Sequence, residues 1–461
     1  MRAHEAGALH GELGTPGPAW LRTPDDVNAL VPRLWPRGVT RGPDGALDVA
    51  GVSVAAIQAE FGTPAYVLDE DDLRARAREF AAAFAGHDVY YAGKAFLCRA
   101  VVRAIAEEGL FLDVCTGGEL ATALSAGMPP ERIAFHGNNK SRAELERAVE
   151  AGVGRIIVDS FDEIERLTAI ARERGVRPAV LVRVTVGVEA HTHEFIATAH
   201  EDQKFGFSLG GGAAFKAVCQ ILDDDVLELR GLHSHIGSQI FDTSGFEVAA
   251  RRLLGLQAQI RDARGVELPE VDLGGGFGIA YTTQDDPQAP ADLAERMIKI
   301  IDDECEALRL ARPRLSIEPG RAIVGPAMFT LYEVGTVKDV DGLRTYVSVD
   351  GGMSDNIRTA LYDASYSATV ASRASAADPI LARVVGKHCE SGDVVVKDEF
   401  LPADVKPGDL LAVPGTGAYC RSMASNYNHV PRPPVVAVRD GRARVIVRRE
   451  TEADLLALDV G

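Results

Sequence analysis

Four segments of the chain contain residues whose types suit one cofactor chemistry. Lys94 ends the apolar run that begins at Val89, and three later segments have the sequences H-S-H-I-G-S from His233, D-L-G-G-G-F-G from Asp272 and E-P-G-R from Glu318. A lysine can form a Schiff base with an aldehyde, a triple glycine can wrap a phosphate, and a carboxylate can face a pyridine nitrogen. Together these groups indicate a site for pyridoxal phosphate (PLP).

Lys94 is the expected Schiff-base residue. A lysine at the end of a strand is usually a solvated charge. Here the run from Val89 to Ala92 is apolar and rich in β-forming residues, which predicts a buried amine. Burial lowers the pKa of an ammonium group and favours the neutral nucleophile.

Gly274, Gly275 and Gly276 end another predicted strand and present backbone N–H groups that no side chain obstructs. Glycines also form tight turns, so the run alone is a weak signal. It follows the seventh strand of the pattern described below, where a barrel of this kind usually binds phosphate. Ser238, next to Gly237, is expected to add a hydroxyl donor to the same phosphate.

His233 and His235 form an H-x-H pair that leaves two alternatives open. In a barrel the pair is also typical of two metal ligands in a hydrolase. The Ile-Gly-Ser that follows favours His235 stacking on an aromatic ring, with His233 on the other side of the strand or behind the site. A second pair, His191 and His193 beside Glu194, lies in a polar stretch that is expected to form a loop over the site.

Glu318 and Cys389 indicate the type of reaction. A carboxylate at the pyridine nitrogen holds its proton, so that the ring can accept the electron pair left when a bond to Cα breaks. An arginine there would keep the nitrogen neutral, so Glu318 favours decarboxylation over racemisation. Cys389 lies among His388, Glu390 and Asp393, an unusually polar setting for a packing cysteine, and is expected to donate a proton.

Residues 66 to 325 alternate short β-rich runs with helical patterns, which predicts an α/β fold with a (β/α)8 TIM barrel. The active site of such a barrel lies at the C-terminal ends of its strands. The polar residues at those ends are Lys94, Asp113, His136 with Asn138, Asp159, Arg183, His235, Gly274 to Gly276 and Glu318. The predicted strands are Val89–Lys94, Leu110–Cys115, Ile133–Gly137, Arg155–Asp159, Ala179–Val184, Leu229–His235, Glu270–Leu273 and Arg314–Glu318. The predicted helices include Gly118–Ala126, Arg142–Ala151, Phe161–Arg174 and Asp292–Arg309.

Residues 326 to 461 alternate strands without helices, which predicts a mainly β C-terminal domain of the β-barrel or Greek-key type. The lead, residues 1 to 65, has apolar residues from Leu47 to Val54 around Gly45 and Gly51, and is expected to contribute a strand pair to that domain. The predicted strands are Leu331–Val337, Arg344–Asp350, Leu381–Lys387, Asp393–Val396, Leu410–Val413, Val435–Val438 and Ala443–Val447.

Composition excludes several classes of protein. The 461 residues are 46% hydrophobic and can bury a full core, while a net charge of -18 disfavours binding to nucleic acid or anionic membrane. We find neither a secretory signal nor an apolar run long enough to cross a bilayer. Six cysteines without C-x-x-C pairs suit a reducing compartment. We therefore expect a cytoplasmic protein that binds neither nucleic acid nor membrane.

From about Ala65 to Glu450 the chain resembles the fold-type III PLP-dependent decarboxylases, and among them the branch that acts on meso-diaminopimelate. The resemblance implies an alanine racemase-like barrel, PLP as cofactor, and decarboxylation of that substrate to L-lysine and CO2, the last step of lysine synthesis. This chain has Phe96 where the family commonly has Asn, which we interpret as a subfamily difference. The motifs are Y-A-G-K-A-F (91–96), D-V-C-T-G-G-E-L (113–120), H-G-N-N-K (136–140), H-S-H-I-G-S-Q (233–239), D-L-G-G-G (272–276), E-P-G-R-A (318–322), V-D-G-G-M-S-D (349–355), C-E-S-G-D (389–393) and G-A-Y (417–419).

The resemblance also implies a role for each matching residue. Lys94 would form the Schiff base, His235 would stack on the ring, Glu318 would face the pyridine nitrogen and Cys389 would donate a proton. Cofactor contacts would come from Ser238, Gly274, Gly275, Gly276, Gly320, Arg321 and Tyr419. Substrate contacts would come from Arg321, Arg358 and Tyr362 for carboxylate, Glu390 for the distal ammonium, and Tyr419.

In the family the Cys-Glu motif of one subunit completes the site of its partner, which implies a homodimer with shared active sites. The substrate has an amino-acid group at each end, and Arg and Glu side chains supply complementary charge for the distal one. Three alternatives stay open: an ornithine- or arginine-type decarboxylase, a metal-dependent barrel hydrolase, and a non-catalytic regulator with the same fold.

Overall fold

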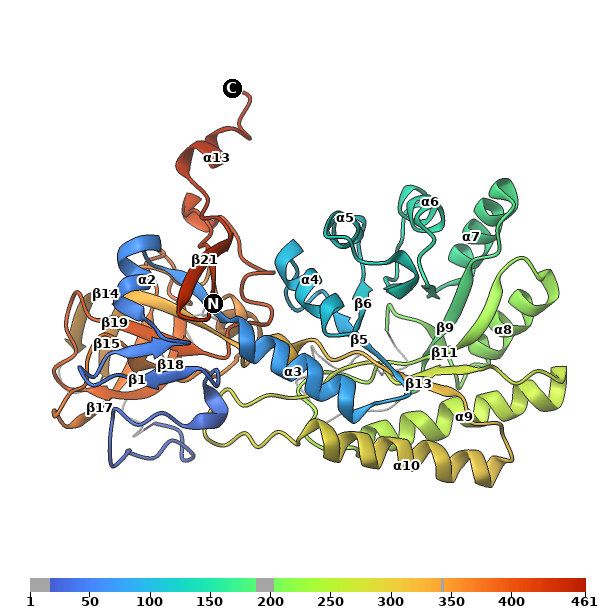
Figure 1. The fold of residues 1–461 in the computed structure, drawn as a ribbon, viewed down its shortest axis with the longest axis horizontal. Coiled ribbons are helices and arrows are strands. Elements are labelled where there is room, and N and C mark those ends of the chain that lie inside the picture. Colours follow the sequence, from blue (N-terminus) through green and yellow to red (C-terminus); the bar gives the residue numbers. More distant parts are fainter. Residues whose placement is uncertain (1–16, 188–202, 341–343) are drawn as a thin grey trace, which may run out of the picture. The chain divides into compact units, whose positions relative to one another are not determined.

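The computed structural model describes residues 17–187, 203–340 and 344–461, and the chain divides into two compact units (Figure 1). We call them the barrel unit and the β unit. The three-part division predicted from the sequence, 1–65, 66–325 and 326–461, stays a prediction. The barrel unit consists of Arg74–Gly278 and Pro287–Ile323, and the β unit of Met1–Leu73, Ile279–Asp286 and Val324–Gly461.

Parallel strands form a closed ring in the barrel unit. Each strand of the ring pairs with the next one along the chain, and the last strand, β13 (Arg314–Ile317), pairs with the first, β5 (Asp88–Ala92), with Ile317 opposite Val89. The predicted (β/α)8 barrel is confirmed, and the end of every strand lies within two residues of its prediction. Among the described residues the strands of the ring are β5 (Asp88–Ala92), β6 (Phe111–Val114), β7 (Ile133–Phe135), β8 (Arg155–Val158), β9 (Ala179–Thr185), β11 (Glu228–His233), β12 (Glu270–Asp272) and β13 (Arg314–Ile317), with β10 (Phe207–Ser208) attached to β9.

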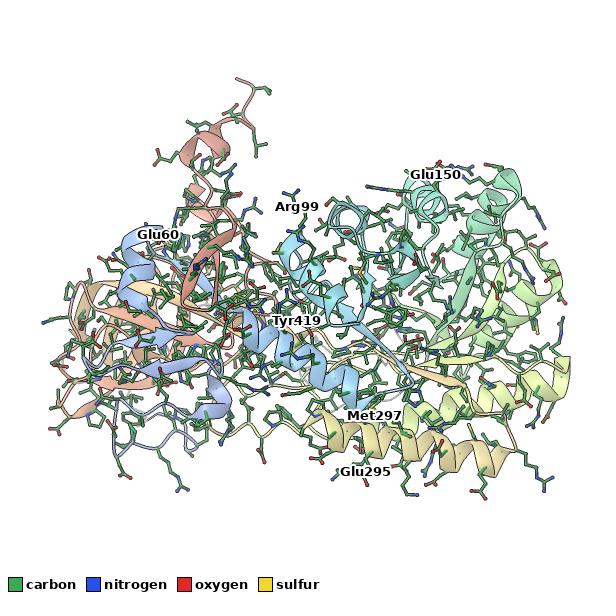
Figure 2. The ribbon with its side chains drawn as sticks, viewed as in Figure 1. Glu60, Arg99, Glu150, Glu295, Met297 and Tyr419 are labelled. Atoms are coloured by element: carbon green, nitrogen blue, oxygen red, sulfur yellow. The ribbon has the colours of Figure 1, made fainter. Side chains whose placement is uncertain are left out.

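Helices connect these strands, and their ends follow local sequence signals. Ser141 and Glu144 form a reciprocal capping box at the start of α6, and Gly152 ends that helix in the left-handed conformation. On α10 the exposed Glu295 and the buried Met297 mark opposite faces (Figure 2). No described helix is long and apolar enough to span a membrane. The helices are α3 (Glu70–Ala83), α4 (Arg99–Glu107), α5 (Gly117–Ser125), α6 (Arg142–Ala151), α7 (Phe161–Arg174), α8 (Ala213–Asp224), α9 (Ser244–Arg264), α10 (Pro290–Leu308) and α11 (Arg321–Val324).

The two ends of the barrel differ in what their polar groups contact. A buried cluster of Tyr90, Ala134, Ile157 and Leu181 fills part of the interior. At the N-terminal ends of the strands, charged residues pair with one another: Arg155 Nη2 lies 2.5 Å from Glu270 Oε1, and Arg314 Nη2 lies 2.5 Å from Asp88 Oδ1. These ion pairs account for the charge at that end, whereas the C-terminal ends hold the residues described in the next section.

The β unit contains a mainly antiparallel sheet, as predicted, built around the long strand β14 (Met328–Val340). Strand β4 (Ala65–Asp69) pairs with β14 and with β20 (Val435–Arg439), so residue 66, where the barrel was predicted to begin, lies inside a strand of this sheet. The other strands are β15 (Arg344–Val349), β16 (Thr369–Val370), β17 (Pro379–Val385), β18 (Val394–Pro402), β19 (Leu410–Pro414), β20 (Val435–Arg439) and β21 (Arg442–Val447). The described α-helices of this unit outside the barrel are α2 (Val54–Phe61) in the lead, α12 (Arg358–Tyr362) and α13 (Glu452–Leu456).

The lead forms its own small sheet within the β unit. Strands β1 (Val39–Arg41), β2 (Leu47–Val49) and β3 (Val52–Ser53) pair with one another and share a core with Phe329 and Val436 of the larger sheet. The expected strand pair is present in β2 and β3. Val54 is not part of it, because Ser53 accepts a hydrogen bond from the Ala56 N–H and starts helix α2 there.

Candidate active site

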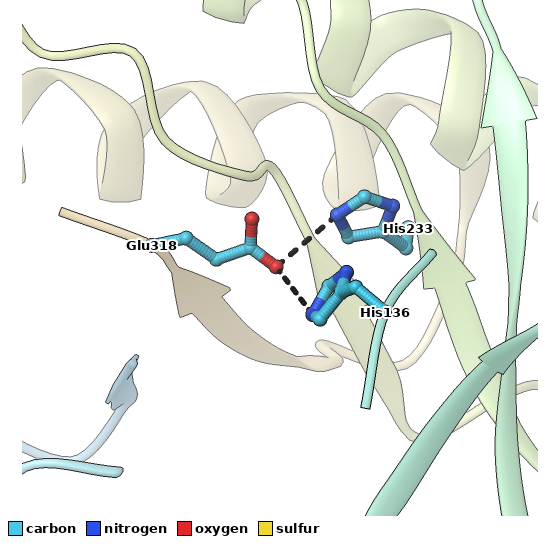
Figure 3. A group of neighbouring side chains, drawn as sticks. All are labelled: His136, His233 and Glu318. Carbon is cyan, nitrogen blue, oxygen red and sulfur yellow. Dashed lines mark ion pairs between the residues drawn. The ribbon is translucent and has the colours of Figure 1, made fainter. Parts of the chain in front are cut away.

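Three buried polar side chains from different strands meet at the C-terminal end of the barrel (Figure 3). Glu318 follows β13, His233 ends β11 and His136 follows β7. The Nε2 atom of His136 lies 3.1 Å from Glu318 Oε1, and the Nε2 atom of His233 lies 3.2 Å from the same oxygen. Both imidazoles therefore reach one oxygen of one carboxylate.

The two histidines control the charge of Glu318. Burial by itself would raise the pKa of this carboxyl, but His136 and His233 outweigh burial and hold the pKa well below its usual range. Glu318 is therefore ionised at neutral pH. A buried carboxylate that stays ionised can bind a cation or accept a hydrogen bond from a protonated ring nitrogen.

Two further carboxyls surround Glu318 and carry less charge. Burial raises the pKa of Asp113, at the end of β6, to about 6, with the negative charge of Glu318 acting in the same direction. Burial likewise raises the pKa of Asp272, at the end of β12, well above its usual range. Asp272 accepts a hydrogen bond of 2.7 Å from the backbone N–H of Gly274. Glu318 is therefore the fully ionised member of this group.

Lys94 lies two residues beyond the end of β5 and is exposed, so the prediction of a buried amine is wrong for this structure. The strand Asp88–Ala92 is buried as predicted, but the chain turns at Gly93 before Lys94. The positive charge of Lys94 nevertheless opposes the rise in the pKa of Asp113 and contributes to lowering the pKa of His235. The charge of the amine therefore reaches the polar residues at the C-terminal end of the barrel.

The H-x-H pair divides between two environments. His233 contacts Glu318, as described above, whereas the Nδ1 atom of His235 accepts a hydrogen bond of 3.2 Å from the backbone N–H of Gly275. Burial, with the positive charges of Lys94 and Arg183, lowers the pKa of His235 well below its usual range. A neutral ring held beside the glycine run can stack on a flat ligand, in keeping with the stacking role that the sequence favoured for His235.

The glycine run forms a cradle that no other residue type could line. A Cβ atom on Gly274 would lie 2.5 Å from the Ser234 carbonyl oxygen, and one on Gly275 would lie 2.1 Å from that of Glu318. Gly274 and Gly276 have φ values of +70° and +109°, which L side chains rarely adopt. The close approach fixes the backbone at the end of β12, but the N–H groups of Gly274 and Gly275 already donate to Asp272 and His235, so the expectation that no side chain obstructs them is wrong for these two glycines.

Ser238 and Arg321, which are far apart in the sequence, contact each other in the barrel unit. Arg321, the buried first residue of α11, donates a hydrogen bond of 2.6 Å from Nη2 to the Oγ atom of Ser238. Gly320 packs against β5, where an added Cβ would lie 2.8 Å from the Cβ of Ala92. Nine predicted site residues thus belong to the barrel unit: Lys94, His235, Ser238, Gly274, Gly275, Gly276, Glu318, Gly320 and Arg321.

The remaining predicted residues belong to the β unit. Cys389 is an exposed thiol and Glu390 is half-buried, both in the loop between β17 and β18. Asp393 fixes this loop, because its carboxylate accepts hydrogen bonds from the backbone N–H groups of His388 at 2.7 Å and of Met353 at 2.6 Å. The His388 ring adds a contact of 2.8 Å from Nε2 to the Oγ atom of Ser354.

Arg358 lies in a cage of tyrosines in the β unit. Its guanidinium lies 4.8 Å from the ring centre of Tyr281 and 6.0 Å from that of Tyr419, and its Nη1 atom donates a hydrogen bond of 2.6 Å to the Tyr366 hydroxyl. Its Nε atom is buried without a hydrogen-bond partner among the described residues. Tyr362, one turn after Arg358 on α12, is half-buried.

Tyr419 has a φ of +68°, which is rare for a residue other than glycine. Such a conformation persists where the surrounding structure imposes it, often beside a ligand.

Sequence reasoning placed His136, Asp113 and Arg183 at strand ends but gave them no role. Arg183 lies with its Nε atom 3.8 Å from Asp159 Oδ2, and its charge affects both His233 and His235.

Two expectations have a limited outcome. The stretch with His191, His193 and Glu194 lies outside the described residues. Among the residues that are described, the group with the spacing of a metal site is His136, His233 and Glu318, and not the H-x-H pair that suggested a metal.

Comparison with known proteins places the chain in one family. Residues 70–325 match the family model described as pyridoxal-dependent decarboxylase, pyridoxal binding domain. Diaminopimelate decarboxylase of Mycobacterium tuberculosis strain H37Rv is 60% identical over 94% of this chain and 98% of its own length, and that of Mycobacterium leprae is 56% identical over 100% of both chains. The crystal structure of the M. jannaschii diaminopimelate decarboxylase in complex with L-lysine has a TM-score of 0.86 at 32% identity, over 92% of this chain and 98% of the other.

Proposed function

The chain belongs to the diaminopimelate decarboxylase family, and from that premise we propose how its own residues perform the reaction. The reaction removes one carboxyl group of diaminopimelate as CO2 and leaves lysine. We infer that the substrate is the meso isomer and the product L-lysine. The observation on which the proposal rests is the ionised, buried Glu318 beside a glycine cradle at the C-terminal end of the barrel.

PLP is the proposed cofactor, and the residues of the barrel unit suit it. The cradle of Gly274, Gly275 and Gly276 admits no Cβ atom and would hold the phosphate, with Ser238 and Gly320 beside it. Lys94 would hold the cofactor covalently through its amine. When bound, PLP supplies an electron sink for the electron pair left by the departing CO2.

Glu318 would act at the ring nitrogen of the cofactor, and His235 would act on the face of the ring. The Glu318 carboxylate would hold a proton on the pyridine nitrogen, because it stays ionised despite its burial. The ring of His235, fixed by the Gly275 N–H and neutral because its pKa is low, would stack on the flat face of the cofactor without adding charge.

The proposed substrate residues supply the charges that a second amino-acid group requires. Arg358, with a buried Nε atom that has no hydrogen-bond partner among the described residues, and Arg321 would bind carboxylate, with Tyr362 beside Arg358. Glu390 would bind the distal ammonium, and Tyr419 would contact both cofactor and substrate. Cys389 would return a proton to the carbon that lost CO2.

We also infer a homodimer in which the Cys389–Glu390 loop of one subunit completes the site of its partner. All six cysteines are free thiols, which supports the predicted location in a reducing compartment, the cytoplasm. The net charge of -18 supports the absence of nucleic acid and anionic membrane among its partners.

A substrate comparison tests this proposal. Purified protein reconstituted with PLP should release lysine from meso-diaminopimelate and show little turnover of ornithine or arginine, which have no distal carboxylate. Glu390→Ala should lower kcat/KM for diaminopimelate by roughly tenfold or more while leaving PLP affinity unchanged, because a charged hydrogen bond is lost only toward the substrate. Equal turnover of ornithine, or unchanged diaminopimelate kinetics in Glu390→Ala, would contradict the assignment.

A further inference from the structure

His136 and His233 reach the same oxygen of Glu318 from two strands that are not neighbours in the ring (Figure 3). Their rings meet edge to face with centres 5.0 Å apart. Each of the three residues is at most 5% exposed, so the group is buried. Both contacts involve Oε1, and neither involves the second carboxylate oxygen, Oε2.

We propose that His136 and His233 are positioning residues that hold Oε1 of Glu318 and so keep Oε2 directed at the pyridine nitrogen of the cofactor. This inference rests on the function proposed above and extends it to two residues without an assigned role. A carboxylate anchored through one oxygen at two points cannot rotate without losing at least one contact. The anchor therefore fixes where the negative charge lies, which is the requirement for a preorganised partner of a ring nitrogen.

The protonation of His233 agrees with this role. Burial lowers the pKa of His233, which favours the neutral ring with one N–H group, against the opposing charge of Glu318. Both ring nitrogens of His233 are buried without a hydrogen bond of good geometry among the described residues, and Nε2 is the one that lies 3.2 Å from Glu318 Oε1. A buried N–H that stays unpaired costs more free energy than one that points at a nearby anion. We therefore assign the proton to Nε2, the ring nitrogen that faces Glu318.

A metal ion is the competing explanation for the same geometry. The ligand atoms of His136, His233 and Glu318 lie within 4.8 Å of one another, and tetrahedral zinc with bonds of about 2.0 Å would separate such atoms by about 3.3 Å. However, the positive charges of Arg183 and Lys94 act on His233 and contribute to lowering its pKa. The negative charge of Glu318 acts in the opposite direction, so zinc binding by the protein without PLP is the measurement that separates the two explanations.

A double-mutant cycle separates the two explanations. The variants are His136→Phe and His233→Phe, each made alone and in a Glu318→Gln background, and each purified with PLP. His87→Phe is the matched control, because His87 lies at the opposite end of the same barrel, where its Nδ1 atom accepts from the Leu315 N–H at 3.3 Å. His233→Gln, which keeps an N–H donor, tests rescue. The readouts are the visible absorption spectrum across pH, kcat and KM, and zinc binding by the protein without PLP.

Each Phe variant should lower kcat by roughly tenfold or more with little change in KM, since it removes one of the two polar contacts that hold the charged carboxylate. It should also alter the pH dependence of the cofactor spectrum, and His233→Gln should recover part of both. In the Glu318→Gln background the same changes should have little further effect. His87→Phe should leave the spectrum unchanged.

Three results would overturn the inference: unchanged spectra and kcat in the Phe variants, full additivity with Glu318→Gln, or stoichiometric zinc binding that the Phe variants lose. A different result would overturn the underlying function instead. If Glu318→Gln itself left the spectrum and kcat unchanged, Glu318 would not face the ring nitrogen at all. Poor folding of a Phe variant is detected by comparing its circular dichroism with that of His233→Gln, and the Gln variant then decides the outcome.

Discussion

Arg321 donates a hydrogen bond of 2.6 Å to the hydroxyl oxygen of Ser238, a residue that is 83 positions away in the chain. Because the arginine occupies the oxygen as an acceptor, the hydroxyl hydrogen of Ser238 can be donated in another direction. A residue proposed to contact substrate therefore also orients a residue proposed to contact the cofactor phosphate. The two binding functions are coupled through one side-chain pair.

Ser238→Ala should weaken PLP binding by roughly tenfold, because the phosphate loses one hydrogen bond of about 1 to 1.5 kcal/mol. Arg321→Lys should weaken PLP binding less, since the serine keeps its own hydroxyl, but it should raise KM for diaminopimelate. Fluorescence titration of the cofactor-free protein with PLP measures the first effect, and steady-state kinetics the second. A Ser238→Ala protein with wild-type PLP affinity would exclude the serine from the phosphate site.

Gly275→Ala should prevent stable PLP binding, because its Cβ would lie 2.1 Å from the carbonyl oxygen of Glu318 and would move the residue that faces the ring. Gly255→Ala is the matched control, since the helix α9 around Gly255 leaves open space at that Cβ. The control should be stabilised by roughly 0.5–1 kcal/mol. Cofactor content and melting temperature, measured for both variants, give the comparison. Normal cofactor content in Gly275→Ala would contradict the cradle.

The sequence predicted the barrel strands well because a strand buried on both faces has a continuous apolar run. The same reasoning does not separate Ala65–Asp69 from the barrel, which was predicted to begin at residue 66. That run is apolar and is followed by the helix Glu70–Ala83, so its local pattern equals that of a barrel unit. Only its pairing with β14 and β20, hundreds of residues later, assigns it to the other sheet.

Site residues were predictable by position but not by environment. Lys94 was expected to be buried because its strand is, yet the chain turns at Gly93 and leaves the lysine exposed. Charge at a strand end is also not sufficient evidence of a site, because Arg155 and Glu270 begin their strands and simply pair with each other. The contact of His136 with Glu318 depends on closure of the barrel, which no local pattern records.

Stability should depend on pH through Asp355 of the β unit. Burial raises the pKa of this carboxyl from 3.8 to about 7, against the opposing hydrogen bond from the Tyr332 hydroxyl. The folded protein therefore binds a proton that the unfolded chain releases between these values, so this contribution to stability is present below about pH 4 and is lost as pH rises through about 7.

The loss amounts to at most about 4 kcal/mol. Asp355→Asn removes it, so the melting temperature of the variant relative to the wild type should rise by several degrees between pH 5 and pH 8. All other titrating groups are shared by the two proteins and cancel in the difference. A difference in melting temperature that stays constant across this range would show that Asp355 has no raised pKa in the folded state.

The proposed shared site predicts complementation between subunits. Lys94→Ala and Cys389→Ala homodimers should each be nearly inactive. After subunit exchange, each heterodimer should contain one site with both residues intact and should recover part of the wild-type activity. Heterodimers verified by mass spectrometry that stay inactive would assign Cys389 to the site of its own chain or to no catalytic role.

The most direct test of the central claim is the identity of the lysine that holds PLP. The reconstituted protein is reduced with borohydride, digested and analysed by mass spectrometry. We predict a phosphopyridoxyl group on Lys94 in the wild type, and its absence from the Lys94→Ala variant together with loss of the visible cofactor absorption. A label on a different lysine, or an unchanged spectrum in Lys94→Ala, would contradict the assignment of Lys94 and the site built around it.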